Sequence, residues 1–159
     1  MAIRTATLGT LLRRLVEELD GAVERSYADA GLDYRPRYTP IVRALIRHGP
    51  ATIRALSSHA CVTHSAAGQT VNQMADRGLV TLTAGEDARE RIVALTPVAE
   101  SIIPRLERIW ANTEAAARTL DEDLGLSLPD VLARTLDLLE ERPFVERLQA
   151  MAVQSASND

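Results

Sequence analysis

The stretch from residue 63 to residue 96 changes its hydrophobic period once, and this change limits the folds open to the chain. In "THSAAGQTVNQMADRGLV", apolar residues from Ala67 to Ala75 recur at helical spacing. After Gly78, which is placed for a left-handed helix end, "LVTLT" and "ERIVALT" alternate with a period of two. The sequence therefore predicts an amphipathic helix that leads directly into a β-hairpin, with Gly85 in its turn.

Threonine is placed to cap four of the predicted helices. These residues are Thr39, Thr52, Thr63 and Thr96. The first and the last are followed by proline, which suits the first position of a helix. Longer amphipathic helices are predicted over residues 5–30 and 97–120, with Gly31 ending the first. Two more helices follow, one capped by Ser127 and one opening at Pro143.

Charge is distributed unevenly along the 159 residues, whose net charge is −4. Residues 35–99 carry a net charge of +4, whereas residues 1–34 carry −2 and residues 100–159 carry −6. All 18 basic residues are arginine, so every cation is a planar group with several donors. This pattern indicates that residues 35–99 form a module that faces an anion, within an otherwise acidic chain. The alternative is that the basic residues cluster there by chance.

Several classes of protein are disfavoured by the sequence. One cysteine excludes a disulfide framework and a multi-cysteine zinc site, so we expect no metal and no other cofactor. Acidic residues interrupt the N-terminal stretch, which is not a signal peptide, and no segment reaches the ~20 apolar residues of a membrane span. These features lead us to expect a cytoplasmic, reduced protein. Because no phosphate-binding glycine loop or catalytic triad is apparent, we do not expect an enzyme.

Short helices followed by a hairpin and flanked by long helices resemble the MarR family, the multiple-antibiotic-resistance-type transcription regulators. The hairpin matches the family pattern D-x-R-x-x-x-V-x-L-T at its five defined positions, Asp87, Arg89, Val93, Leu95 and Thr96. The preceding helix ends in "DRGLV", as in the family, and a further helix follows the hairpin through "TPVAE". The resemblance covers residues 38–100.

The resemblance implies a mainly α fold with a small β-hairpin wing. It implies an N-terminal dimerisation helix (1–34), a winged helix-turn-helix lobe (35–99), C-terminal dimerisation helices (100–153) and a disordered tail (154–159). An obligate homodimer would place its two lobes in adjacent major grooves of double-stranded DNA, on a pseudo-palindromic operator. The expected function is that of a transcriptional regulator, a repressor released by a small ligand.

The polar face of the helix at residues 63–77 is the candidate for reading bases. The candidate residues are Ser65, Ala66, Gly68, Gln69, Asn72 and Gln73. Glutamine and asparagine can bond adenine through two hydrogen bonds in the major groove, and small residues allow close approach. Family members often have arginine at the position of Gln69, so base contact here would depend on amides. The alternative is a helix face that is only hydrated.

Phosphate or minor-groove contacts are assigned to basic residues around this helix. They are Arg54, His64, Arg89 and Arg91, with Asp87 as a support for the wing. Arg43 and Arg47 are further candidates for contacts with phosphate. The alternatives are an exposed ion pair in the wing, worth less than ~1 kcal/mol, and surface charges that only aid solubility.

Cys61 stands at a turn position where the family usually has glycine. It lies close to the start of the helix at residue 63, where the helix dipole favours a thiolate, so a redox-responsive regulator is an alternative function. A small buried side chain is the other interpretation. "HACVTH" also groups Cys61 with His59 and His64, but across so tight a turn these residues have poor geometry for zinc.

Three aromatic residues are candidates for an effector pocket, namely Tyr34, Tyr38 and Trp110. The resemblance implies that small aromatic or phenolic acids bind between the dimerisation helices and the winged lobe. Packing in the core is the alternative for these residues, and for Tyr27. A winged helix that docks proteins through its acidic outer helices is an alternative for the whole chain, and a salt-dependent DNA mobility shift would distinguish the two functions.

Overall fold

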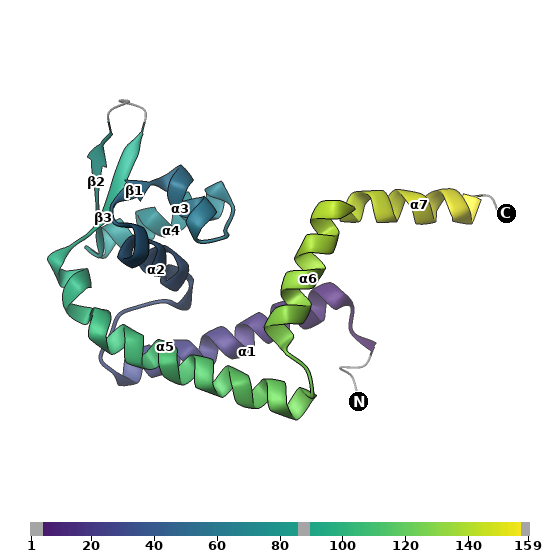
Figure 1. Cartoon of the computed structure of the whole chain (residues 1–159), viewed down its shortest axis with the longest axis horizontal. Coiled ribbons are helices and arrows are strands. Elements are labelled where there is room, and N and C mark those ends of the chain that lie inside the picture. Colours follow the sequence, from purple (N-terminus) through teal and green to yellow (C-terminus); the bar gives the residue numbers. More distant parts are fainter. Residues whose placement is uncertain (1–4, 86–89, 157–159) are drawn as a thin grey trace. The chain divides into compact units, whose positions relative to one another are not determined.

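The computed structural model describes residues 5–85 and 90–156, and it confirms a mainly α-helical fold with a small antiparallel sheet (Figure 1). The helices are α1 (Leu8–Asp29), the 3-10 helix η2 (Pro36–Tyr38), α2 (Thr39–His48), α3 (Ile53–His59), α4 (His64–Asp76), α5 (Pro97–Leu124), α6 (Leu128–Glu141) and α7 (Phe144–Ala156). The strands are β1 (Ala51–Thr52), β2 (Val80–Ala84) and β3 (Arg91–Leu95). The chain forms two compact units, Met1–Asn112 and Thr113–Asp159.

The predicted hairpin is present, and a third strand joins it. β2 and β3 pair from Val80 opposite Leu95 to Ala84 opposite Arg91, and β1 adds to the other edge of β3 with Ala51 opposite Val93. The side chain of Val93 is buried, so the sheet turns one face to the helices. The sheet therefore fastens the wing to the segment between α2 and α3, a contact that the sequence does not predict.

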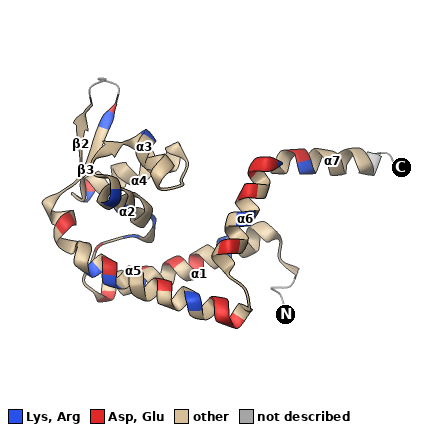
Figure 2. Ribbon diagram, in the orientation of Figure 1, with Lys and Arg blue, Asp and Glu red and all other residues tan. Residues whose placement is uncertain are grey.

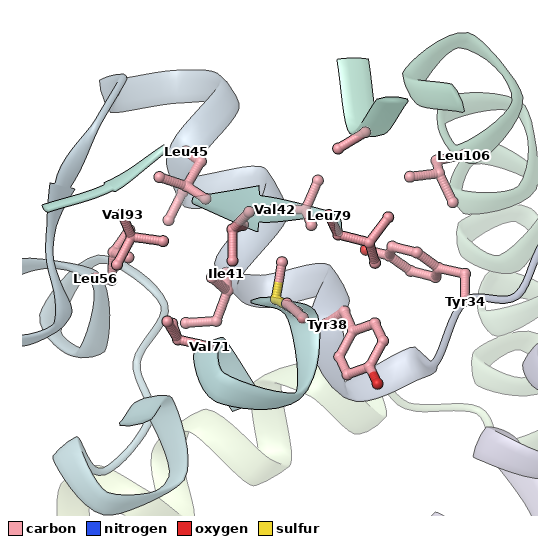
Figure 3. Packing of buried hydrophobic residues seen from close by; sticks show 14 of the residues in the cluster. Tyr34, Tyr38, Ile41, Val42, Leu45, Leu56, Val71, Leu79, Val93 and Leu106 are labelled. Atoms are coloured by element: carbon pink, nitrogen blue, oxygen red, sulfur yellow. The ribbon is translucent and has the colours of Figure 1, made fainter. Parts of the chain in front are cut away.

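The helix-turn-helix consists of α3 and α4. The N–H of Ala55 donates to Thr52 Oγ1 (3.1 Å) and the N–H of Ala66 donates to Thr63 Oγ1 (3.2 Å), so both predicted caps are confirmed. The inner face of α4 buries Ala67, Val71 and Met74 completely. In Figure 3, side chains from α2, α3, α4 and β3 meet in one cluster, which holds α4 with its other face outward.

Thr39 is not an N-cap, and the prediction for this residue was wrong. Its backbone is already helical (φ −52°, ψ −47°), because η2 runs directly into α2 and Thr39 becomes the first residue of that helix. Its hydroxyl lies 3.2 Å from the hydroxyl of Tyr27 instead. Thr96 does cap α5, since it accepts from the N–H of Ala99 (3.2 Å).

The ends of the other helices agree with the sequence in most cases. Gly31 and Gly78 have positive φ angles of 68° and 66°, as expected for residues that follow helices. Ser127 caps α6 through the N–H of Asp130 (3.3 Å). α5 extends to Leu124 rather than to about residue 120, and α7 extends to Ala156, inside the segment expected to be a tail.

Several helices leave large apolar side chains exposed. On α1 these are Leu8, Leu11, Leu12, Val16 and Leu19; on α6 they are Val131, Leu132, Leu136 and Leu138; on α7 they are Phe144, Val145, Leu148, Met151 and Val153. Of the helices in the described residues, none is long and apolar enough to cross a membrane. Exposed faces of this size are typical of surfaces that pack against another protein chain.

Candidate nucleic-acid interface

The outward face of α4 presents small and amide side chains. Ser65, Ala66, Gln69 and Asn72 are exposed, while Gly68 and Gln73 are half-buried. Exposure follows directly from the burial of Ala67, Val71 and Met74 on the opposite side, because residues three and four apart share a helix face. Most of the predicted base-reading residues are therefore placed together on one accessible surface.

Gly68 contributes no side chain at the centre of this face. A methyl group added at this position would meet no described atom within 4 Å, so packing inside the lobe does not require glycine. Glycine in a helix interior costs about 1 kcal/mol relative to alanine. The low profile it leaves would favour close approach of another molecule to the α4 backbone.

Gln73 differs from the other two amides of the helix. Its Oε1 is buried and has no hydrogen-bond partner among the described residues. Oxygen and nitrogen of an amide can be exchanged by rotation, so the group that turns inward can be the donor or the acceptor. Either way, part of the Gln73 amide points into the lobe, and the base-reading role predicted for Gln73 has less geometric support than that of Gln69.

The basic residues assigned to phosphate contact are accessible where the structure describes them. Arg54 on α3, His64 at the start of α4 and Arg91 at the start of β3 are all exposed. Figure 2 shows basic residues and no acidic ones along α2 and α3. Asp87 and Arg89, the remaining wing residues of the prediction, lie outside the described residues.

Two other arginines are held by aromatic rings. The guanidinium of Arg43 lies over the ring of Trp110, 4.7 Å from its centroid. Arg77 donates from Nη1 to the hydroxyl of Tyr38 (2.8 Å) and lies 3.6 Å from the carboxylate of Asp33. Arg77 therefore connects the end of α4 to the segment before α2. This role was not predicted from the sequence, where the place of Arg77 before Gly78 gives no sign of a partner so far away along the chain.

Cys61 occupies the turn between α3 and α4 with a φ of 53°, the left-handed conformation that glycine adopts most readily. Its side chain is exposed, so the interpretation as a small buried residue was wrong. His59 of the "HACVTH" cluster stacks on His48, with ring centroids 4.0 Å apart. In the parts of the chain that the structure describes, no group of three or more histidine, cysteine or acidic residues is placed to hold a metal ion.

The candidate effector residues are part of the core. Tyr34, Tyr38 and Trp110 are all buried, and Tyr34 makes edge-to-face contacts with Tyr38 (5.5 Å) and Tyr27 (4.8 Å). Trp110 Nε1 donates to the hydroxyl of Tyr27 (3.0 Å). These contacts explain the burial of all four rings as packing, and an effector site at Tyr34, Tyr38 and Trp110 stays a prediction.

Burial has a direct effect on the acidity of Tyr34. It raises the pKa of the Tyr34 phenol well above its ordinary value, and the nearby hydroxyl of Thr39 opposes this rise only in part. The Tyr34 hydroxyl is buried without a hydrogen-bond partner among the described residues. The folded protein thus favours the neutral form of the Tyr34 phenol. The stability that depends on this neutral form is complete below pH ~10, and it decreases as the pH rises above the pKa that the phenol has in the unfolded chain.

Tyr34→Phe is expected to leave the free energy of unfolding at pH 7 unchanged or to raise it by about 1 kcal/mol, because it removes a buried hydroxyl that lacks a partner. Above about pH 10 the variant should lose less stability than the parent protein. Urea unfolding at both pH values measures the two effects. Tyr27→Phe is the matched control: it removes the hydroxyl that Trp110 and Thr39 contact, and it should cost about 1–2 kcal/mol. Equal losses in the two variants at pH 7 would contradict this account.

Comparisons with known proteins agree with the observed fold. The model of the MarR family matches residues 31–90. The transcriptional regulator MOSR of M. tuberculosis, solved in complex with DNA, is 20% identical with a TM-score of 0.65, over 86% of this chain and 96% of that chain. BpsR of Bordetella bronchiseptica, whose DNA binding is regulated by 6-hydroxynicotinic acid, is 17% identical with a TM-score of 0.60, over 84% of this chain and 96% of that chain.

A third structure has a somewhat more similar sequence. A MarR family transcriptional regulator from Silicibacter pomeroyi is 26% identical with a TM-score of 0.61, over 85% of this chain and 96% of that chain. No curated protein matches the sequence significantly. The family model covers α2, α3, α4 and β2, which are the elements that carry the exposed amide face. Through the segment 31–90, which includes the helix-turn-helix, the chain is similar to the MarR family of transcriptional regulators.

Proposed function

We propose that the protein binds specific sequences of double-stranded DNA as a homodimer and represses transcription until a small ligand releases it. The observation that carries this proposal is the exposed, uncharged face of α4 beside the hairpin. Gln69 and Asn72 can each bond an adenine edge through two hydrogen bonds. Positive charge for the DNA backbone would come from Arg54 and Arg91, which are exposed on neighbouring elements.

A homodimer is supported by the apolar faces of α1, α6 and α7. In a single chain, the leucine, valine and phenylalanine side chains of these helices named above are exposed to solvent. A second copy related by two-fold symmetry would cover these faces. Each Å² of apolar surface that it removes from water would stabilise the dimer by about 25 cal/mol. A two-fold dimer in turn calls for a pseudo-palindromic operator, with half-sites about 10 bp apart.

The effector in this proposal is a small aromatic or phenolic acid. The aromatic cluster of Tyr34, Tyr38 and Trp110 supplies apolar ring faces, and the buried hydroxyl of Tyr34 offers an unused hydrogen-bonding group. BpsR, which shares the fold, responds to a hydroxylated aromatic acid. A ligand would have to open the packing between these rings, and this would couple its binding to the position of the winged lobe.

Selection of genomic DNA fragments by the purified protein tests the proposed function. The bound fragments should share one inverted repeat, and affinity for that repeat should fall steeply as salt concentration rises. Fragments that share no sequence, or binding that salt does not affect, would contradict the proposal.

The exposure of Cys61 supports a second candidate, a regulator that responds to oxidants. Its thiol lies in the turn that sets the position of α4, so oxidation there would alter the recognition surface. Under this alternative, peroxide should release DNA from the parent protein, whereas Cys61→Ser should keep its affinity for DNA in peroxide. Equal release from both proteins, measured by fluorescence anisotropy of labelled DNA, would remove the alternative.

A further inference from the structure

A hollow on the winged lobe lies between α2, α3 and the turn that follows α3. It encloses about 250 Å³, and the residues that line it include Arg43, Arg47, His48, His59 and Cys61. α2 supplies one wall because Arg47 follows Arg43 by four residues and His48 follows Ala44 by four, which places these pairs on one side of the helix. The end of α3 supplies the other wall.

The side chains that line this hollow are basic or apolar, apart from Cys61. Two arginines and two histidines line it and, among the described residues, no acidic residue does, in a chain with more acidic than basic residues. The rings of His48 and His59 are stacked with an interplanar angle of 14°, so they form a flat wall that carries ring N–H groups. The ring of Trp110 holds Arg43 in place through the contact at 4.7 Å.

Basic residues at these positions also have a simpler role. Arg47 and His48 are in the last turn of α2 and His59 is in the last turn of α3, where a positive charge stabilises a helix by about 0.3–1 kcal/mol. That role needs no contact between the two helices. It accounts for neither the stacked pair of imidazoles from different helices nor the position of Arg43, in the middle of α2, beside the same hollow.

We propose that this hollow binds a small oxyanion, a phosphate or carboxylate group, held by Arg47 and the stacked imidazoles of His48 and His59, with Arg43 in the same wall. A guanidinium binds such groups through two parallel hydrogen bonds, and imidazole N–H groups add further donors. The volume suits an anion of a few heavy atoms or a small organic acid, since pockets for drug-sized ligands usually exceed about 300 Å³. The site lies within the winged lobe, and its Arg43 contacts Trp110 of the aromatic cluster proposed for the effector.

An anion in this hollow would act on the recognition helix through the turn. His59 is the last residue of α3, and Cys61 belongs to the short connection that ends at Thr63, the cap of α4. An occupant that contacts α2 and this turn together would fix the turn relative to α2. Any change in DNA affinity that the anion causes must then appear equally as a change in anion affinity when DNA is bound.

Histidine side-chain NMR with inorganic phosphate tests the site in the absence of DNA. Phosphate should shift the ring signals of His48 and His59 in a saturable manner, when compared with chloride at the same ionic strength and pH. His64 does not line the hollow and should not respond, which makes it the internal control. Because this titration contains no DNA, its result is independent of the proposed regulatory function.

Matched arginine variants locate the site. Arg47→Gln should weaken phosphate binding about tenfold, because the bound anion loses a charged partner with two donors. Arg47→Lys should recover part of this loss, and Arg54→Gln should change the affinity less than twofold, since Arg54 is exposed outside the hollow. Equal weakening by Arg47→Gln and Arg54→Gln would show general attraction to positive charge and would overturn the proposal.

A titration with duplex DNA distinguishes two sources of the oxyanion. If the His48 and His59 signals still respond to phosphate in the DNA complex, the hollow takes a free anion. If DNA alone moves them and phosphate then has no effect, the hollow takes a phosphate of the DNA backbone. The proposal is wrong if neither phosphate nor DNA moves these two signals.

Discussion

Val16→Glu is expected to convert a homodimer into monomers, with the dissociation constant of the dimer raised about 100-fold, equivalent to about 3 kcal/mol. Val16 is 56% exposed in the single chain and lies in the apolar face of α1 with Leu12 and Leu19. Burial of an unpaired carboxylate in an interface is unfavourable, and two-fold symmetry introduces the charge twice. Light scattering or sedimentation at micromolar concentration would measure the change.

Arg14→Glu is the matched control for this experiment. It also adds a carboxylate to α1, but on the polar side, where Arg14 makes an exposed contact of 3.8 Å with Glu18. The control should remain dimeric, because exposed ion pairs of this kind contribute less than about 1 kcal/mol. A parent protein that is already monomeric at micromolar concentration would contradict the proposed dimer, and equal dissociation of the two variants would show that α1 does not bury its apolar face in it.

The local signals in the sequence predicted most of the helix boundaries. Thr52, Thr63 and Thr96 are N-caps as expected, because each accepts a hydrogen bond from the N–H three residues later, and the backbone of Thr52 and Thr63 is extended. Thr39 precedes proline as Thr96 does, yet it lies inside a helix. The difference is the 3-10 turn before Thr39, whose formation depends on the burial of Tyr38 in the core, and no local pattern shows that burial.

Contacts between residues far apart in the chain could not be predicted from local sequence patterns. β1 has two residues, and it forms because Ala51 pairs with Val93. A strand this short contains no run of alternating apolar residues from which it could be predicted. His59 was grouped with His64 because the two are close in sequence, but its ring packs on His48 of another helix. The hollow beside His48 and His59 could not be predicted for the same reason, since its two walls come from separate helices.

The outward face of α4 was predicted in part. Helical periodicity correctly placed Gln69 and Asn72 opposite the buried Val71 and Met74. Periodicity treats Gln73 as a neighbour of Gln69 one turn away, but it cannot show that the oxygen of Gln73 turns inward. The orientation of a half-buried amide depends on the packing around it and not on its position along the helix.

Gln69→Ala and Asn72→Ala should each weaken binding to the specific site by about 1–3 kcal/mol, or about 5- to 150-fold. The amide of each side chain is exposed and carries no charge, so its loss removes hydrogen bonds to bases without changing the attraction to phosphates. Affinity for unrelated DNA should therefore stay within about twofold of the parent protein. Fluorescence anisotropy with a specific and a scrambled duplex measures both affinities under one salt condition.

Arg91→Ala should give the opposite pattern and serves as the matched comparison. Arg91 is exposed at the start of β3, and a guanidinium at this place would contact the DNA backbone. Its removal should weaken specific and non-specific binding together, and it should make the slope of log affinity against log salt shallower by about 0.9 for each phosphate that the protein no longer neutralises. If the two amide variants instead leave the ratio of specific to non-specific affinity unchanged, the outward face of α4 is only hydrated surface, and sequence recognition must come from another part of the chain.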